Sequence, residues 1–371
     1  MNRQITINQP ARLEIGAGSV ATVGAWAGDA QRVLVLTVDI LRDKVASLGL
    51  RGAVTVYDDI PPEPDDRALE RALDVAGDLK PDLIIGLGGG SVMDIAKLVA
   101  VLWDRSQKLT DVIGPNKVAK RLSRLALIPT TAGTGSEAGI RALVTNSETQ
   151  AKMAVESPFM GADLAVLDPE LTFSVPAAVT AATGIDAMAH CVEAFTNKNA
   201  HDMIDSYARM GIGLVGKYLR RAVENGSDTE AREGMMLASY YGGICLGPVN
   251  TAAGHALAYP LGARLHLPHG LANALIFPHV LAFNQPDRPE KTAEVLSFLG
   301  LKAGSGTEHV SAEAHAFCAS LGVDMKLGNH GATEGDLRSW AEEAHAIRRL
   351  MDNNPRDMSI DQVEAIYKSA L

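Results

Sequence analysis

Apolar and polar residues follow two different rhythms along this chain. In the first half, short apolar runs between polar turns predict buried strands at residues 33–37, 54–57, 83–87 and 125–128. Between the second and third of these runs, apolar positions at helical spacing follow a proline-rich turn and predict a helix over 65–79. Strands that alternate with helices predict right-handed β-α-β units and a parallel sheet.

The pattern changes after Pro176, where long stretches rich in Ala, Leu and Met replace the short apolar runs. These stretches have helical periodicity and predict helices over 177–196, 203–224, 230–246 and 312–321. Two prolines within residues 167–176 would interrupt any regular element, so the domain boundary is placed there. The sequence therefore predicts an α/β domain over 1–175 and an all-helical domain over 176–371.

Composition narrows the class of protein without defining its chemistry. A chain of 371 residues can bury two separate cores, and a formal net charge of -10 argues against a nucleic-acid surface. The cysteines, Cys191, Cys245 and Cys318, are odd in number and widely spaced, which favours free thiols in a reducing cytoplasm. The N-terminus lacks an apolar signal segment, and no apolar run reaches the roughly 18 residues of a membrane helix. We expect a soluble cytoplasmic protein with no nucleic-acid or membrane partner.

A glycine-rich turn, Gly86–Ser91, follows the third predicted strand and opens a helix. Glycines allow a backbone to approach a pyrophosphate closely, and the N-terminus of the following helix offers free N–H groups to an anion. The motif is neither a P-loop nor a complete Rossmann fingerprint, because the last glycine position of that fingerprint falls on Ser91. On its own the turn is as consistent with a plain tight turn as with a phosphate site.

A second polar turn, residues 129–137, follows the fourth predicted strand and is rich in threonine, glycine and serine. Its hydroxyls could bind phosphate or ribose oxygens, or Thr134 or Ser136 could instead cap a helix. Parallel strands share one carboxyl edge, so two such turns together favour a dinucleotide site. Asp39, just past the first strand, would suit the ribose 2′-hydroxyl and favour NAD over NADP, although helix capping is an alternative role.

The candidate metal ligands are Asp186, His190, His255 and His269. The first two lie four residues apart and therefore on one face of a helix. A carboxylate in such an apolar segment is costly unless it is paired or bound to a metal. One carboxylate and three imidazoles suit Fe(II) or Zn(II), but a histidine on an apolar helix is also often an ordinary core residue. Glu193, His266 and His279 are substitutes for these ligands or residues that support them.

These motifs together resemble the iron-containing (group III) alcohol dehydrogenases along essentially the whole chain. The resemblance rests on Gly-Gly-Gly-Ser-x-x-Asp-x-x-Lys at 88–97, Pro-Thr-Thr-Ala-Gly-Thr-Gly-Ser-Glu at 129–137 and Asp-Pro-Glu-Leu-Thr at 168–172. It continues through Gly-Ile-Asp-Ala-Met-Ala-His at 184–190, Gly-His at 254–255, Pro-His-Gly-x-Ala-Asn at 268–273 and Asn-Pro-Arg at 354–356.

The resemblance implies an N-terminal NAD-binding α/β domain, a C-terminal helical domain of the dehydroquinate synthase-like architecture, and a metal ion in the cleft between them. It implies that Asp186, His190, His255 and His269 bind the metal, and that Asp39 disfavours NADP. The residues that match cofactor-contact positions of the family are Gly88, Gly89, Gly90, Ser91, Asp94, Thr130, Thr131, Thr134 and Lys152. A homodimer is expected from the same resemblance.

Two positions depart from the family pattern. Tyr259 stands where many members have a histidine four residues after the third ligand, so a tyrosine hydroxyl would have to take over any proton relay there. Arg141 stands where some relatives have an asparagine near the cofactor, and could alter cofactor contacts or bind an anionic substrate.

The function expected is hydride transfer between a small primary alcohol or aldehyde and NAD(H), with the metal ion binding the substrate oxygen. The alternatives are a dehydroquinate synthase-like lyase that uses NAD transiently, a polyol oxidoreductase of the glycerol dehydrogenase type, and a catalytically silent NAD-binding protein.

Overall fold

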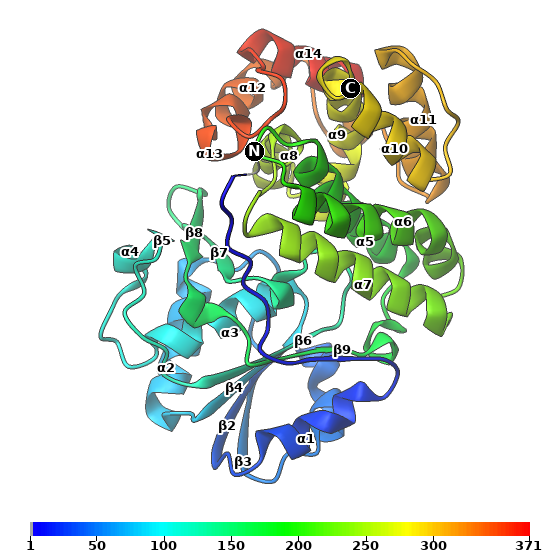
Figure 1. Ribbon diagram of the computed structural model, residues 1–371. Coiled ribbons are helices and arrows are strands. Elements are labelled where there is room, and N and C mark those ends of the chain that lie inside the picture. Colours follow the sequence, from blue (N-terminus) through cyan, green and yellow to red (C-terminus); the bar gives the residue numbers. More distant parts are fainter. Residues whose placement is uncertain (1–2) are drawn as a thin grey trace. The chain divides into compact units, whose positions relative to one another are not determined.

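The computed structural model describes residues 3–371, which form two compact units (Figure 1). The α/β unit consists of Ile7–Thr131 and Gly135–Ser174. The helical unit consists of Val175–Leu371 together with Ala132–Thr134 and the residues up to Thr6.

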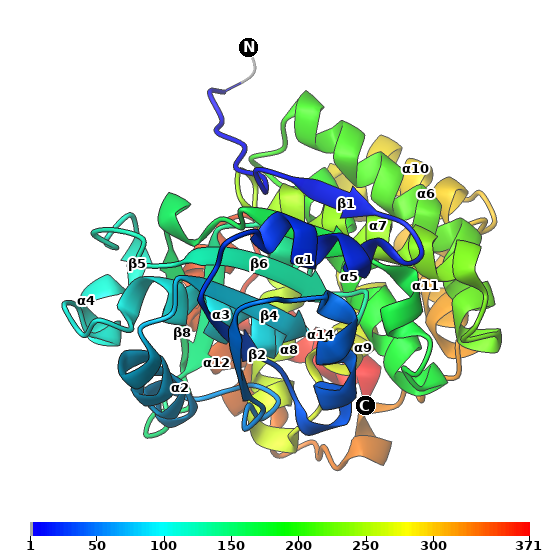
Figure 2. The ribbon, with the colours of Figure 1, turned by 90° about the horizontal axis from the view of Figure 1, so that it is seen from below.

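The α/β unit is built on a six-stranded sheet in which every pair of neighbours is parallel. Its strand order is β1-β9-β6-β4-β2-β3, and Figure 2 shows several of these strands side by side. The strands are β1 (Leu13–Ile15), β2 (Arg32–Leu36), β3 (Ala53–Tyr57), β4 (Leu83–Gly88), β6 (Arg124–Pro129) and β9 (Leu164–Leu167). The four predicted strands and the parallel sheet are confirmed. The sequence analysis did not predict β1 and β9.

Helices cover both faces of this sheet, which explains why its central strands are apolar without alternation. On one face, α2 (Asp66–Leu79) and α3 (Gly90–Leu102) pack against side chains such as Leu34 and Leu125. On the other face, α1 (Thr22–Ala27) and the 3-10 helix Asp39–Leu48 complete a second core. The predicted helix at 65–79 is α2, and its N-cap Asp65 accepts a hydrogen bond from the backbone N–H of Ala68.

A small second sheet, not predicted from the sequence, also belongs to the α/β unit. β7 (Arg141–Thr145) and β8 (Lys152–Glu156) form an antiparallel hairpin, and β5 (Gly114–Pro115), which follows α4 (Leu109–Val112), pairs parallel to β8. In β7, buried residues alternate with partly exposed ones, so the strand lacks the continuous apolar run that marked the central strands.

The helical unit contains only helices and connecting segments among its described residues, as predicted. The predicted helices correspond to α5 (Ala177–Thr196), α6 (Asp202–Glu224), α7 (Thr229–Leu246) and α11 (Thr307–Ser320). The others are α8 (Ala253–Leu265), α9 (His269–Asn284), α10 (Pro289–Phe298), α12 (Leu337–Ala346), α13 (Arg348–Met351) and α14 (Ile360–Ala370). Within residues 3–371, no helix has both the length and the apolar character needed to cross a membrane.

Candidate functional site

The centre of the helical unit contains a carboxylate that is almost completely buried. Asp186 lies near the middle of α5 and is 2% exposed, and His190, one turn further along, is 5% exposed. The Nε2 atom of His190 lies 3.9 Å from Oδ1 of Asp186. Helical spacing alone places these two side chains together, as the sequence predicts.

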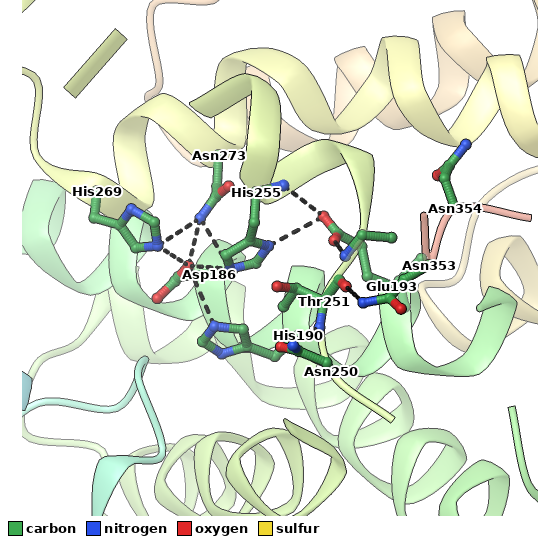
Figure 3. Close-up of polar contacts among 12 residues, drawn as sticks. Asp186, His190, Glu193, Asn250, Thr251, His255, His269, Asn273, Asn353 and Asn354 are labelled. Atoms are coloured by element: carbon green, nitrogen blue, oxygen red, sulfur yellow. Dashed lines mark hydrogen bonds and ion pairs between the residues drawn. The ribbon is translucent and has the colours of Figure 1, made fainter. Parts of the chain in front are cut away.

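Two histidines from other helices reach the same carboxylate oxygen (Figure 3). The Nε2 atom of His255, in the first turn of α8, lies 3.6 Å from Oδ1 of Asp186. The Nε2 atom of His269, the first residue of α9, lies 3.7 Å from it. Among the described residues, Asp186, His255 and His269 form a group whose ligand atoms all lie within 4.8 Å of one another. His190 contacts the carboxylate but lies outside that tighter group.

Asn273 occupies the same place, although the sequence analysis gave it no role. Its Nδ2 atom donates to Oδ1 of Asp186 at 2.7 Å and lies 3.3 Å from Nε2 of His255 and 3.2 Å from Nε2 of His269. It follows His269 by one helical turn, so the signal was present in the motif at 268–273. An amide nitrogen has two N–H groups and can donate to only two of the three atoms around it.

The pKa values of the cluster reflect burial opposed by charge. Burial alone would raise the pKa of Asp186, but His190, His269 and His255 hold it well below its usual range. Burial lowers the pKa of His190 to about 4 despite the nearby Asp186 carboxylate. For His255 burial acts in the same direction, yet Glu193 and Asp186 raise its pKa to about 10. The environment of His255 therefore strongly favours a positive charge.

These features fit a divalent cation. Asp186 and Glu193 are both buried carboxylates, and buried charges are stable only when paired or bound to a metal. The Nε2 atoms of His255 and His269 and Oδ1 of Asp186 form a mixed nitrogen and oxygen donor set of the kind that Zn(II) and Fe(II) accept. Their separations of 3.6 and 3.7 Å suit donors to one ion, because such ligand bonds are about 2.0–2.2 Å long.

Tyr259 lies next to this cluster, one turn after His255 on α8. The centres of the Tyr259 and His269 rings are 5.8 Å apart. Its hydroxyl accepts a long hydrogen bond, 3.4 Å, from Nη2 of Arg349. The tyrosine is thus close enough to a candidate ligand to contact a molecule bound there.

The predicted dinucleotide residues of the α/β unit follow adjacent strands at one sheet edge. Asp39 follows β2, the glycine turn follows β4 and the turn with Thr130 and Thr131 follows β6, and these three strands are neighbours in the order β6-β4-β2. Connections leave β2 toward β3 and β4 toward β6, in opposite directions, so β2 and β4 flank a topological switch point. Ligands of open α/β sheets bind at this position.

Local contacts explain how the glycine turn keeps its shape. A Cβ atom at Gly88 would lie 2.7 Å from Val92, so a larger residue would force this turn away from α3. Gly89 is the N-cap of α3, and a Cβ atom there would lie 3.3 Å from Oγ1 of Thr131. The backbone N–H of Thr130 donates to the carbonyl of Gly88 at 3.1 Å, which joins the two turns. Gly90 is the first residue of α3, whose free N–H groups face this turn.

The helix-capping alternatives are wrong for the residues where they were considered. Gly135, not Thr134, is the N-cap of the short 3-10 helix Ser136–Ala138, and no side chain caps that helix. Val38 precedes the 3-10 helix that begins at Asp39, again without a side-chain cap. Asp39 is exposed at the sheet edge. Thr134 belongs by its contacts to the helical unit.

The remaining cofactor candidates have protein partners. Oγ of Ser91 accepts from the backbone N–H of Glu63 at 3.1 Å, and Nζ of Lys152 pairs with Glu63 and donates to Oγ1 of Thr145 at 2.9 Å. The Nε and Nη2 atoms of Arg141 donate to Oε2 of Glu156, at 3.0 and 2.7 Å. The guanidinium is thus paired with a carboxylate of its own hairpin, which gives no support to a role in binding an anionic substrate.

Asp94 and Lys97, one turn apart on α3, form a buried network with the second turn. The Asp94 oxygens accept from Oγ of Ser136 at 2.6 Å and from the N–H of Leu143 at 2.9 Å. Nζ of Lys97 donates to Ser136 Oγ at 2.8 Å and to the carbonyl of Arg141 at 2.7 Å. The sequence analysis did not assign a role to Lys97, because burial of a lysine is not visible in a local pattern.

Comparison with known proteins gives this arrangement a family. The sequence profile described as "Iron-containing alcohol dehydrogenase" matches residues 10–169, and "Fe-containing alcohol dehydrogenase family, C-terminal" matches residues 180–371. The chain belongs to the iron-containing alcohol dehydrogenase family. This confirms the resemblance derived from the sequence motifs.

Three relatives illustrate the range of the iron-containing alcohol dehydrogenases to which the chain is similar. It is 38% identical to "Long-chain-alcohol dehydrogenase 1" of Geobacillus thermodenitrificans over 92% of this chain and 90% of that protein. It is 31% identical to "NAD-dependent methanol dehydrogenase" of Bacillus methanolicus over 96% and 97% of the two chains. The solved structure of a 1,3-propanediol oxidoreductase superposes with a TM-score of 0.94 at 31% identity, covering 100% of both chains.

Proposed function

We propose that this protein is a metal-dependent alcohol dehydrogenase that transfers a hydride between a small primary alcohol or aldehyde and NAD(H). The observation that carries the proposal is the buried Asp186 carboxylate with imidazole nitrogens of three histidines within 3.9 Å. Membership of the iron-containing alcohol dehydrogenase family and an NAD-dependent relative support the reaction and the cofactor. The relatives are named for different alcohols, and the hydroxyl group is what those substrates share.

In this proposal Asp186, His190, His255 and His269 hold Fe(II) or Zn(II). The ion, when bound, supplies a Lewis acid for the substrate oxygen. The residues of this chain have different tasks: Asp186 supplies negative charge, the imidazoles supply neutral nitrogen ligands, and the apolar helices around them exclude water. The Tyr259 hydroxyl, beside His269, is the proposed group for moving a proton to or from solvent.

NAD is proposed to bind at the sheet edge defined by β2, β4 and β6. The pyrophosphate would lie against Gly88, Gly89 and Gly90 at the N-terminus of α3, where free N–H groups and the helix dipole favour an anion. Asp39, exposed at the end of β2, would bind the ribose 2′-hydroxyl and repel a 2′-phosphate. The other proposed contacts are Ser91, Asp94, Thr130, Thr131, Thr134 and Lys152.

Further proposals concern organisation. We propose a nucleotide domain over 1–175 and a metal and substrate domain over 176–371, supported by the contact-based units, which separate at Ser174 and Val175. A cytoplasmic location is supported by Cys191, Cys245 and Cys318, which are buried free thiols. A homodimer is proposed from the family resemblance.

The proposal is tested with an anaerobic assay of NADH formation from small alcohols, with Fe(II) or Zn(II) supplied. Asp186→Ala and His269→Ala are expected to abolish metal retention and turnover while the chain stays folded. His315→Ala, which removes an exposed histidine on α11, is the matched control and should behave like the native protein. Undiminished turnover in either ligand variant after removal of metal would contradict the proposal. NAD recycling without net NADH would instead favour the lyase.

A further inference from the structure

Glu193 is a buried carboxylate on the same face of α5 as the candidate ligands. It follows Asp186 by seven residues and His190 by three, which places all three on one side of the helix. Its side chain is 8% exposed, so an ionised carboxylate here needs partners inside the protein. Its partners all lie at the start of α8, the helix that carries His255.

Both oxygens of Glu193 accept hydrogen bonds from α8. Oε1 accepts from the backbone N–H of His255 at 3.0 Å and lies 3.1 Å from Nδ1 of the same residue, while Oε2 accepts from the backbone N–H of Ala252. Ala252, the N-cap of α8, has no side chain that could cap the helix. Glu193 therefore supplies, from another helix, the acceptor that a helix N-terminus requires.

Gly254 leaves the space that this carboxylate fills. A Cβ atom at Gly254 would lie 2.1 Å from Oε1 of Glu193 and 3.1 Å from its Cδ. Any larger residue would push the carboxylate away from α8. Glu193 and Gly254 thus form a matched pair, in which the missing side chain of one residue allows the hydrogen bonds of the other.

The contact with Nδ1 determines how the His255 ring is presented. With Nδ1 bound to Oε1 of Glu193, the opposite ring nitrogen, Nε2, faces Asp186 and Asn273 at 3.6 and 3.3 Å (Figure 3). A carboxylate acceptor on one imidazole nitrogen keeps the proton there and leaves the other lone pair available to a metal ion. The ring orientation and the chemical state of Nε2 thus depend on a residue that does not itself reach the candidate metal position.

We propose that Glu193 is a positioning residue that directs Nε2 of His255 toward the metal ion, with Gly254 providing the space it needs. This inference rests on the proposed function, because it takes His255 as a metal ligand. Glu193 acts through His255 and the first turn of α8, and it contacts neither substrate nor cofactor in this role.

The decisive variant is Glu193→Gln, which keeps the size of the side chain. A glutamine has one oxygen, so its NH₂ group must face either Ala252 N–H or His255, both of which are donors. We measure binding of Co(II), a probe for sites of this ligand type, by competition with a chelator, together with its visible absorption spectrum. Affinity is expected to fall about 10- to 100-fold, with a changed spectrum.

Two further variants make the test specific. Gly254→Ala keeps the carboxylate but displaces it, and is expected to weaken Co(II) binding in the same direction. Glu294→Gln, which breaks a half-exposed ion pair with Arg209, is the matched control and should leave affinity and spectrum unchanged. Gly254→Ala also serves as the decisive variant if Glu193→Gln fails to fold.

The outcomes separate this inference from the proposed function. If Glu193→Gln and Gly254→Ala lower the unfolding temperature but bind Co(II) with native affinity and spectrum, Glu193 is only a helix cap and the inference is overturned. If the native protein binds neither Co(II) nor Zn(II), the proposed function fails and the inference falls with it.

Discussion

Lys97→Met is the substitution that most directly tests the buried network beneath the dinucleotide loops. Lys97 has no exposed surface, and its Nζ donates to Ser136 Oγ at 2.8 Å and to the Arg141 carbonyl at 2.7 Å. It also lies 3.8 Å from Oδ1 of Asp94. Burial lowers the pKa of Lys97 and raises that of Asp94, although each attracts the other. Methionine keeps the length of the side chain and removes the charge.

The expected cost follows from leaving a buried carboxylate without its cation. Removing one partner of a buried ion pair costs about 3–5 kcal/mol, whereas replacing both partners is often nearly neutral. We therefore expect Lys97→Met to lower the free energy of unfolding of the α/β unit by about 3–5 kcal/mol at pH 7. The double variant with Asp94→Asn should recover at least half of that loss, because no charge is then left unpaired.

The pH dependence has a defined sign. Without Lys97, the folded-state pKa values of Asp94 and Glu137 rise further. An acid whose folded-state pKa is raised destabilises the protein as the pH rises above its unfolded value. The loss caused by Lys97→Met should therefore be larger at pH 8 than at pH 5.

Urea unfolding followed by tryptophan fluorescence measures this loss. Trp26 and Trp103 lie in the α/β unit and Trp340 in the helical unit, so a Trp340→Phe background reports the α/β unit alone. A loss below about 1 kcal/mol, or an equal loss in the double variant, would refute the reasoning, since the buried charge would then need no partner.

Three further predictions follow from the same kind of argument. Burial raises the pKa of Glu137 to about 7, so folding takes up a proton there and its cost grows between pH 4.5 and 7; Glu137→Gln should be more stable than the native protein at pH 8 but not at pH 4, by urea titration. A Cβ atom at Gly270 would lie 2.3 Å from the carbonyl oxygen of Ala182 on α5, so Gly270→Ala should displace the start of α9 and weaken Zn(II) binding, whereas Gly213→Ala, with its nearest atom at 3.7 Å, should not. Tyr259→Phe should retain Zn(II) and stability but slow steady-state turnover by about 100-fold or more, and native turnover in that variant would exclude the hydroxyl from proton transfer.

Much of the fold was readable from local patterns. The continuous apolar runs of β2, β4 and β6 indicate strands that are covered on both faces, and the helical periodicity after Pro176 indicates the helical unit. The hairpin of β7 and β8 was missed because a half-buried strand alternates and contains polar residues such as Arg141 and Lys152. The three-residue strand β1 is too short to produce a pattern at all.

The candidate metal cluster divides in the same way. Asp186 and His190 could be paired from the sequence, because a spacing of four residues on a helix is a local geometric fact. Their meeting with His255 and His269 could be expected only through resemblance to a family, since no periodicity relates residues on three different helices. Asn273 lies at the centre of the cluster and was not singled out, because an amide has no distinctive spacing of its own.

The sequence by itself determined which segments are strands or helices, and therefore that the glycine and threonine turns follow parallel strands and that Asp186 and His190 share a helix face. Only the tertiary structure decided which distant side chains share a partner: Glu193 with His255, Lys97 with Ser136, and Asn273 with Asp186. The physical reason is range. Backbone periodicity is set by neighbours a few residues away, whereas the partner of a buried polar group is set by how helices and loops pack, to which the whole chain contributes.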